Sequence, residues 1–468
     1  MLDFRDLSVP ELAAAVRSRQ LSAREVVGHA IERIETLNPS LNAFVATDLG
    51  RARRDAAAID ERLARGDDVG PLAGIPIGVK DLEAVEGMVT TFGSALRAGD
   101  APATADCVHV ARYRAAGAVI IGKTNTPEYG HKGATDNPLF GATANPWSPA
   151  HSPGGSSGGS AAAIAAGMVP LATGSDGGGS IRIPGALCGL SVLKTEQGRI
   201  PISGPTMPGS GLLSTNGPMG WKVRDSAYAL DVAIGADGGD PLSLPHPGVS
   251  WSAALAEAAG RGPDTVVWSP TMGFAEVDAE ILAACEHAIA ALEAAGTRVV
   301  RLDRVFDEDP LGPWLTLWFA ARFKAQGHLI GTPDFERVSE SLRPQIEAGA
   351  TLSALDHARA HDAMYALNAQ LEVAFGHAPF ILTPTTAGQT PRLGEDGVVN
   401  GEASVGWVRF SYGINMTRNP AGTTPVGLSS AGLPIGLQVI GRHHDEVGVM
   451  ATMAAIEATS GFDARPPV

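Results

Sequence analysis

The chain has 468 residues, of which 44% are hydrophobic and 18% are charged, a composition that is typical of a folded globular protein and excludes global disorder. Thirty-five basic residues against fifty acidic ones give a formal net charge of −15, and no basic run is long enough to follow a phosphate backbone, so no nucleic acid partner is expected. The three cysteines are far apart and lie in no metal-binding spacing, which argues against a disulfide framework and a structural zinc.

The first segment, up to about residue 70, is predicted to be helical. Its start carries acidic residues and a proline where a signal peptide needs a basic start, and no apolar run of about 18 residues follows anywhere in the chain. We therefore expect a cytoplasmic protein without membrane contact. Ser22 and Glu25 form a capping box ahead of apolar residues at helical spacing, which predicts a helix that ends at 38–40. A second helix is predicted over 51–64.

Short apolar runs alternate with helical patterns from about residue 71 to residue 210. The stretch LAGIPIGVKD indicates a buried strand that ends near Lys80. This alternation predicts an α/β fold, with a mixed central β-sheet flanked by helices on both faces. The other elements predicted here are strands at 118–122 and 169–176 and helices at 105–116 and 160–167.

The remainder continues the α/β pattern after a looser, proline- and glycine-rich region. No internal repeat of fixed period is found. We expect a single domain with N-terminal helices at 1–70, a core at about 71–210, a variable insertion at about 211–370 and a C-terminal core part at about 371–468. The predicted later elements are strands at 264–269, 297–302, 381–384 and 433–440, a helix at 278–295, and a helical segment around Trp314 to Phe323.

Two glycine-rich stretches carry serines: HSPGGSSGGS at 151–160 and GSDGGGSIRIPG at 174–185. The first runs directly into a small-residue helix, which does not suit a flexible linker. It also lacks the lysine of a GxxxxGK[ST] phosphate-binding loop. In the second, three glycines precede Ser180, so the backbone can turn with positive φ and direct its N–H groups to one point, as an oxyanion hole requires.

These residues resemble the amidase signature hydrolases. The resemblance implies the amidase signature fold and amide hydrolysis, with Ser180 as the nucleophile, Ser156 as a bridging serine after a cis peptide bond, and Lys80 as the base. It also suggests a homodimer. The similar segments are GGSSGGS at 154–160, Asp176 to Pro184, GIPIGVKD at 74–81, KTNTPEYG at 123–130, NPW at 145–147 and LPIGLQVIG at 433–441.

Amide hydrolysis needs an activated nucleophile, a stabilised oxyanion and a proton for the leaving nitrogen. Ser156 can relay a proton from Ser180 to Lys80 only if Lys80 is neutral, which requires its pKa to fall from about 10.4 to near 7 through burial. The expected oxyanion donors are the backbone N–H groups of Gly177, Gly178, Gly179 and Ser180. Gly177 stands where many family members carry threonine or isoleucine, and the glycine keeps that donor. This chemistry needs no metal and no organic cofactor.

Other residues near the motifs are expected to support the site. Ser157 is predicted to fix its loop, and Asp176 and Arg182 to hold the turn around the nucleophile. His131 and His151 would also allow a Ser-His-Asp arrangement, but the lysine and the second serine already account for the proton transfer.

The substrate pocket is expected to include residues of the 211–370 segment and residues near 416–419. Trp314 and Trp318 have helical spacing with two phenylalanines, which favours core packing, with an apolar acyl or aryl pocket as the alternative. The candidates for substrate binding are Thr126, Trp314, Trp318 and Asn419. We therefore expect a small-molecule amide, hydrophobic or aromatic, as the substrate.

Three other functions remain open. One is the glutamine-hydrolysing component of a tRNA amidotransferase, which is disfavoured by the TPE triplet at 126–128, by Tyr412 where an aspartate is expected, and by the acidic chain. The second is hydrolysis of linear or cyclic aminohexanoate amides, which SDGGGSIRIP also resembles. The third is a non-catalytic binding protein on this scaffold, against which the presence of Lys80, Ser156 and Ser180 argues.

Overall fold

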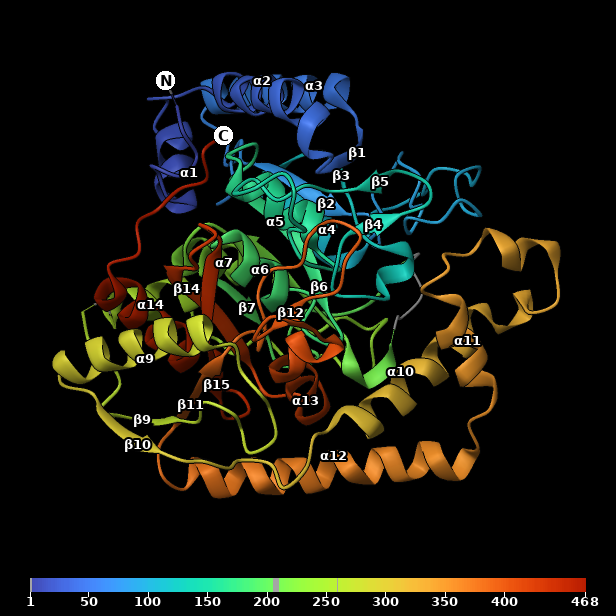
Figure 1. Cartoon of the computed structure of the whole chain (residues 1–468). Coiled ribbons are helices and arrows are strands. Elements are labelled where there is room, and N and C mark those ends of the chain that lie inside the picture. The colour runs from blue at the N-terminus through green and yellow to red at the C-terminus, as the bar shows by residue number, and fades with distance from the viewer. Residues whose placement is uncertain (1, 205–209, 259) are drawn as a thin grey trace.

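The structure is a computed structural model that describes residues 2–204, 210–258 and 260–468. Two mixed sheets occupy the centre of the molecule and helices cover them on both sides (Figure 1). This arrangement confirms the predicted α/β fold. In the part of the chain that is described, no helix is both long enough and apolar enough to cross a membrane.

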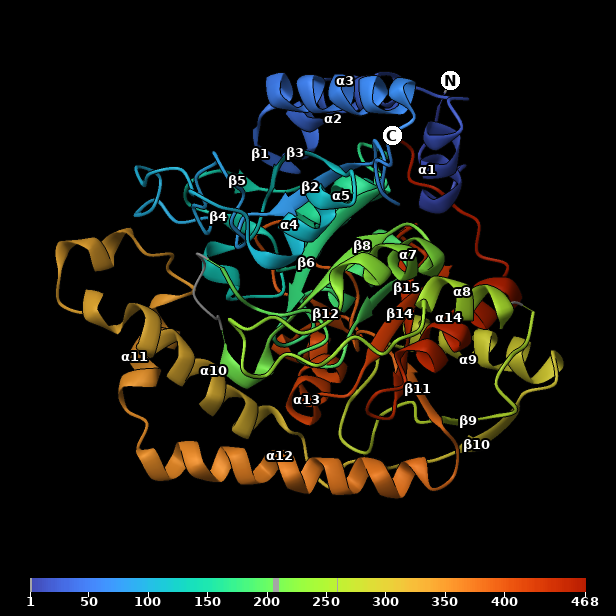
Figure 2. The same ribbon diagram turned by 180° about the vertical axis from the view of Figure 1, so that it is seen from behind.

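Three helices form the N-terminal part and lie together at one end of the molecule (Figure 2). They are α1 (Val9–Arg17), α2 (Ala23–Leu41) and α3 (Leu49–Arg65). The capping box predicted at Ser22 and Glu25 is present at the start of α2. The predicted end at 38–40 is slightly early, since α2 continues to Leu41. The helix tolerates Pro39 because this residue lies in the last turn, where few helical hydrogen bonds are affected. The left-handed Asn42 then ends the helix.

The first sheet has the strand order β1-β3-β2-β6-β8. Its central strand β2 (Pro76–Lys80) pairs in parallel with β3 (Val119–Thr124) and β6 (Leu171–Asp176). The edge strands β1 (Phe44–Thr47) and β8 (Thr215–Gly220) pair antiparallel. Every residue of β2 is buried, as expected of a parallel strand that is covered on both faces. The carboxyl ends of β2 and β6 meet at one edge, which brings Lys80 and Asp176 to the same side of the sheet.

The second sheet has the order β10-β9-β11-β15-β14-β7 and adjoins the first where β7 lies beside β8. Within it, β9 pairs in parallel with β10 and β11, and the other pairs are antiparallel. Because β8, β9 and β10 fall within 211–370, the segment predicted as an insertion also supplies strands to both sheets. The bounds are β7 (Val192–Lys194), β9 (Thr265–Trp268), β10 (Arg298–Arg301), β11 (Phe380–Pro384), β14 (Ala421–Leu428) and β15 (Pro434–Gly441).

Two short hairpins, eleven further α-helices and five short 3-10 helices make up the other regular elements of the described chain. The long helix α12 lies far from the first sheet, and it packs against α10, α13 and strand β11 of the second sheet (Figure 1). The hairpin strands are β4 (Asp136–Asn137), β5 (Gly141–Ala142), β12 (Val398–Val399) and β13 (Glu402–Ala403). The helices are α4 (Val108–Ala115), α5 (Gly158–Ala165), α6 (Arg182–Cys188), α7 (Val223–Ala233), α8 (Trp251–Glu257), α9 (Ala279–Ala294), α10 (Leu311–Gln326), α11 (Arg343–Ala350), α12 (Ala354–Phe375), α13 (Arg409–Thr417) and α14 (Glu446–Ser460).

Helix α5 explains the small residues that follow the first serine stretch. All eight of its residues are buried, and it packs against β2, β6 and α6. A side chain at Gly159 would collide with the backbone of Asn125, so only glycine permits this close approach. The glycines therefore place the start of α5, and the serine loop before it, directly against the carboxyl ends of the parallel strands.

Candidate active site

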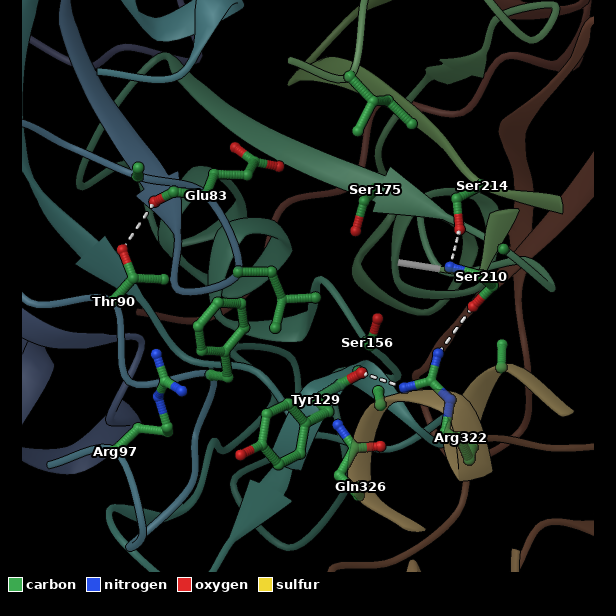
Figure 3. Close-up of a pocket in the computed structure, with 18 of the residues that line it drawn as sticks. Glu83, Thr90, Arg97, Tyr129, Ser156, Ser175, Ser210, Ser214, Arg322 and Gln326 are labelled. Carbon is green, nitrogen blue, oxygen red and sulfur yellow. Dashed lines mark hydrogen bonds between the residues drawn. The ribbon is translucent and has the colours of Figure 1, made fainter. Parts of the chain in front are cut away.

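A cavity of about 690 Å³ opens at the carboxyl ends of β2 and β6, with Ser156 and Ser175 in its wall (Figure 3). Ser180 also lines it. Apolar and aromatic side chains form much of the remaining wall. They include Leu82, Phe92, Leu96, Tyr129, Trp318 and Leu329. The cavity thus combines hydroxyl groups with an apolar surface, which is the usual composition of a small-molecule site.

Lys80 is fully buried at the end of β2, where its ammonium group is surrounded by serines. Its Nζ lies 2.8 Å from Ser156 Oγ and 2.8 Å from Ser157 Oγ, and 3.0 Å from Ser175 Oγ. Its backbone N–H donates to Thr173 Oγ1 at 2.9 Å. The structure therefore brings together Lys80 and Ser156, which the sequence places 76 residues apart.

Burial lowers the pKa of Lys80 from 10.5 to about 7. The negative charges of Glu83 and, to a lesser degree, Asp176 raise this pKa and so partly oppose the effect of burial. An amine with a pKa near 7 is half neutral at physiological pH and can accept a proton there. The lysine at the end of a buried strand thus has the proton affinity that a general base needs.

Ser156 and Ser157 lie at the start of α5, and both are buried. The peptide bond between Gly155 and Ser156 is cis, as the family resemblance implies. Ser157 anchors the loop in two ways: its N–H donates to the Ser180 carbonyl at 3.2 Å, and its hydroxyl lies 3.4 Å from the Ser175 carbonyl. These contacts are consistent with the predicted structural role of Ser157.

Ser180 follows a tight turn that the Asp176 carboxylate holds from inside. The Gly179 N–H donates to Asp176 Oδ1 at 2.7 Å, and the Ile181 N–H donates to Asp176 Oδ2 at 3.1 Å. The Gly179 N–H is therefore engaged within the turn, which differs from its predicted role as an oxyanion donor. For the N–H groups of Gly177, Gly178 and Ser180, the described residues supply no acceptor.

Arg182 and Asp176 form a fully buried ion pair directly behind this turn. Arg182 Nη2 lies 3.0 Å from Asp176 Oδ1, and its guanidinium also donates to Gln438 Oε1 at 2.7 Å and to Asn415 Oδ1 at 2.6 Å. Burial favours the neutral acid, but the Arg182 charge outweighs it and holds the pKa of Asp176 well below its usual range. The network fixes the backbone that carries Ser180 to the second sheet and to α13.

Gly179 is the position in this turn where a side chain is least tolerable. Its φ is +119°, and a Cβ atom would overlap the Ser411 side chain. We expect Gly179→Ala to reduce turnover at this site at least 10-fold and to lower the thermal midpoint, since the turn must move. Gly66→Ala is the matched control: Gly66 also has positive φ (+83°) but has open space around it, so it should cost about 1 kcal/mol and leave turnover unchanged. Equal turnover in the two variants would contradict this role of Gly179.

Of the four predicted substrate-binding residues, one lines the cavity and three do not. Trp318 lines the cavity, whereas Trp314 stacks on Trp318 and donates from Nε1 to the Gly177 carbonyl at 3.0 Å. Thr126 and Asn419 are buried outside the described lining, where Asn419 Nδ2 donates to the Gly441 carbonyl. These two residues lie inside the packed core, so the structure corrects their prediction as substrate contacts. Trp314 contacts the turn before Ser180 and lies outside the described lining of the cavity.

His131 and His151 do not offer an alternative base. Burial lowers the pKa of His131 to about 3, and its two ring nitrogens are held by the Glu128 carbonyl and Ser341 Oγ, each at 2.7 Å. His151 pairs with Ser148 and lies outside the described lining of the cavity.

A buried pair of Glu83 and His109 also lines the cavity and was missed in the sequence. His109 Nε2 lies 3.0 Å from Glu83 Oε2, and Thr173 Oγ1 donates to the same oxygen. Burial disfavours the charged imidazole, but Cys107 and Glu83 outweigh burial and raise the pKa of His109 well above its usual value. Thr173 and Ser175 alternate on β6, so period-two spacing could have identified both as facing Lys80. No sequence spacing links Glu83 to His109.

Comparisons with known proteins assign nearly the whole chain to one protein family. The Amidase family model matches residues 25–450. An acylamidase of Rhodococcus erythropolis is 37% identical, covering 98% of this chain and 97% of that protein. The crystal structure of a bacterial aryl acylamidase of the amidase signature family superposes with a TM-score of 0.89 at 31% identity, covering 97% of this chain and 96% of that one. One component of the glutamyl-tRNA(Gln) amidotransferase of Synechococcus is 32% identical, covering 99% of both.

Proposed function

This chain belongs to the amidase signature family of hydrolases, and on that basis we propose that it cleaves an apolar or aryl carboxylic amide through an acyl-enzyme on Ser180. The single observation that carries the proposal is the contact of 2.8 Å between the buried Lys80 Nζ and Ser156 Oγ, at the wall of a cavity that Ser180 also lines. A neutral buried amine against a serine hydroxyl is an arrangement for proton transfer.

In the first step, Ser180 Oγ attacks the amide carbon and forms the new C–O bond. The Ser180 proton passes to Ser156 Oγ, and the Ser156 proton passes to neutral Lys80 Nζ. The backbone N–H groups of Gly177, Gly178 and Ser180, which have no acceptor among the described residues, are the donors available to the oxyanion. Gly179 is left out of this set because its N–H is bonded to Asp176.

In the second step, the C–N bond breaks and the leaving nitrogen takes a proton from Ser156, which regains one from Lys80. The products of this step are a free amine or ammonia and an ester on Ser180. Water gives a proton by way of Ser156 to Lys80 and adds to the ester carbon. The C–O bond to Ser180 then breaks, Ser180 Oγ regains a proton from Lys80 by way of Ser156, and the carboxylic acid is released. Lys80 ends the cycle neutral.

The apolar wall supports an apolar or aromatic substrate. Phe92 and Tyr129 stack with ring centroids 5.7 Å apart, and Trp318 also lines the cavity. Such surfaces favour acyl chains or aryl groups over small polar amides. The names of the acylamidase and aryl acylamidase relatives agree with this substrate class.

Serine labelling followed by an amide panel tests the proposal. Wild-type protein is treated with a fluorophosphonate and mapped by peptide mass, and then assayed with 4-nitroacetanilide, butyryl-4-nitroanilide and benzamide. We expect an adduct on Ser180 that is lost in Lys80→Met, and release of nitroaniline or ammonia. An unlabelled Ser180 in folded wild-type protein, together with no turnover, would overturn the proposal.

Glutamine hydrolysis for a tRNA amidotransferase is the second candidate, favoured by the similarity to the Synechococcus protein. Tyr412 stands where an aspartate was expected for that role, and its hydroxyl donates to Asp309 Oδ1 at 2.6 Å. We therefore expect L-glutamine to be a poor substrate. Release of ammonia from glutamine faster than from benzamide would reverse the order of the two candidates.

The pH dependence of kcat/KM should report on Lys80. Only neutral Lys80 can accept the proton, so activity should rise with pH through about 7. The Glu83 charge raises the pKa of Lys80, so Glu83→Gln should lower that pKa and move the rising limb to lower pH. Asp100→Asn is the control, because Asp100 lines the same cavity but pairs with Arg97 at 2.5 Å. A rising limb that stays fixed in Glu83→Gln, or moves equally in Asp100→Asn, would contradict this assignment.

A further inference from the structure

Arg322 is a buried charge in the wall of the cavity, and no carboxylate in the described chain pairs with it. Its Nη1 donates to the Tyr129 carbonyl at 2.8 Å and its Nη2 to Ser210 Oγ at 2.7 Å, while the guanidinium lies 4.3 Å from the centre of the Trp318 ring. Figure 3 shows Arg322 reaching from its helix between Tyr129 and Ser210. All three partners are neutral.

The charge of Arg322 persists despite its burial. Burial lowers the pKa of this guanidinium to about 10, so it remains protonated at neutral pH. A buried charge without a counter-charge costs several kcal/mol unless an opposite charge joins it. In addition, Arg322 Nε and, one helical turn later, Gln326 Oε1 are buried without a hydrogen-bond partner among the described residues. The site thus has an unused donor and an unbalanced positive charge.

The partners of Arg322 connect it to both sides of the reaction centre. Tyr129 precedes Gly130, where an added methyl group would lie 3.2 Å from Ser156 Oγ. Ser210 donates from its backbone N–H to Ser214 Oγ at 3.2 Å, and that hydroxyl would lie 3.2 Å from a methyl group on Gly177. Ser156, Gly177 and Arg322 also line the same cavity, so a ligand that fills it can contact the reaction centre and the guanidinium together.

The other charged groups that line the cavity are balanced among themselves. Glu83 is paired with His109, Asp100 with Arg97 at 2.5 Å, and Asp334 with Arg337 at 2.8 Å. Lys324 adds an exposed positive charge at the rim. Although the protein carries a net charge of −15, the cavity carries a net positive charge that is centred on Arg322.

We propose that Arg322 binds a carboxylate of the substrate, so that the preferred amide carries a free carboxylate in addition to its apolar part. Arginine suits this task because its guanidinium stays charged and presents several donors to a carboxylate. Gln326 contributes a neighbouring polar group on the same face of α10. This inference rests on the proposed amide hydrolysis and adds the charge of the substrate to it.

Matched substrate pairs test the inference on both halves of the amide. On the acyl half, succinyl mono-4-nitroanilide is compared with neutral butyryl-4-nitroanilide; on the amine half, 4-acetamidobenzoate is compared with acetanilide. Wild-type protein is expected to favour the carboxylate member of one pair. Arg322→Gln should then reduce kcat/KM for that member about 100-fold while changing the neutral member by less than about 3-fold. Which pair responds identifies the half that carries the charge.

Control variants distinguish a direct contact between Arg322 and the substrate carboxylate from a general effect of positive charge around the cavity. Arg322→Lys keeps the charge and should restore part of the preference, whereas Arg337→Gln removes a charge that is already paired and about half exposed, and should leave both pairs unchanged. Neutral amides cleaved as fast as their carboxylate partners by wild type, or an equal loss for both members in Arg322→Gln, would overturn the inference while leaving amide hydrolysis intact.

A binding measurement needs no turnover and so distinguishes failure of this inference from failure of the proposed function. Calorimetry with 4-phenylbutyrate and with 4-phenyl-1-butanol should show tighter binding of the carboxylate by wild type, and loss of that difference in Arg322→Gln. Arg322→Gln must retain the circular dichroism spectrum and thermal transition of wild type for the comparison; Arg322→Lys serves in its place otherwise. Equal affinity for the two ligands in wild type would overturn the carboxylate site.

Discussion

Lys80→Met and Ser180→Ala are each expected to reduce kcat for a neutral anilide on the order of 10⁴-fold or more, since residues that act as a unit each abolish most of the catalysis. Lys80 holds Ser156 at 2.8 Å, and the proposed mechanism passes every proton through that contact. The double variant Lys80→Met with Ser180→Ala should be no slower than either single variant. The measurement is single-turnover kinetics on protein whose folding is verified by circular dichroism.

Lys194→Met provides a matched control for removing a buried lysine. Burial also lowers the pKa of Lys194 to about 7, but Lys194 lies outside the described lining of the cavity, and its Nζ donates to the Thr195 carbonyl at 3.1 Å. Lys194→Met should therefore retain kcat within about 3-fold if it folds. A Lys80→Met protein that keeps a tenth of wild-type activity would show that Lys80 is not the base.

Asp176→Asn is expected to lower the free energy of unfolding by about 3–5 kcal/mol, because it leaves the Arg182 guanidinium as an uncompensated charge in the core. Both side chains are fully buried, and Arg182 Nη2 lies 3.0 Å from Asp176 Oδ1. The pKa of Asp176 lies below its ordinary value of 3.8, so this contribution is present at neutral pH and is lost only as the pH falls below that value. Urea unfolding followed by tryptophan fluorescence measures the change.

Two control variants show whether the loss of unfolding free energy in Asp176→Asn comes from the uncompensated Arg182 charge. Glu286→Gln breaks the exposed pair with Arg301, whose atoms lie 2.9 Å apart, and should cost less than about 1 kcal/mol. The double variant Asp176→Asn with Arg182→Met removes both charges and should recover part of the stability that Asp176→Asn loses. Equal losses in Asp176→Asn and Glu286→Gln would contradict the importance of this ion pair.

The sequence predicted much of the fold because local patterns are strong in the core. The strand at 118–122 corresponds to β3 (Val119–Thr124), and the helix at 278–295 to α9 (Ala279–Ala294). Elements such as β8 and β14 were missed, since their glycines and prolines resemble loop sequence and only pairing with neighbouring strands makes them regular. The helix α12 was missed because its buried residues are sparse and the hydrophobic pattern is weak.

The reactive groups were easier to predict than the cavity around them. Glycine-serine stretches and a lysine at a strand end are recognisable from local sequence. The resemblance to the amidase signature hydrolases then indicated that they belong to one site. Arg322 gave no comparable signal, because an arginine in a helical pattern is usually exposed. Its burial depends on contacts with Tyr129 and Ser210, more than 100 residues away in the chain. Long-range packing of this kind leaves no local trace.

The division of the cavity between two parts of the chain has a consequence for protein engineering. The proposed chemistry uses residues between 80 and 180, whereas Trp318, Arg322 and Gln326 enter the cavity from one helix, α10. A combinatorial library restricted to the cavity face of α10 should therefore yield new substrate preferences at undiminished intrinsic reactivity. Trp314 should not be varied in such a library. Its indole N–H donates to the Gly177 carbonyl and so links α10 to the turn that precedes Ser180.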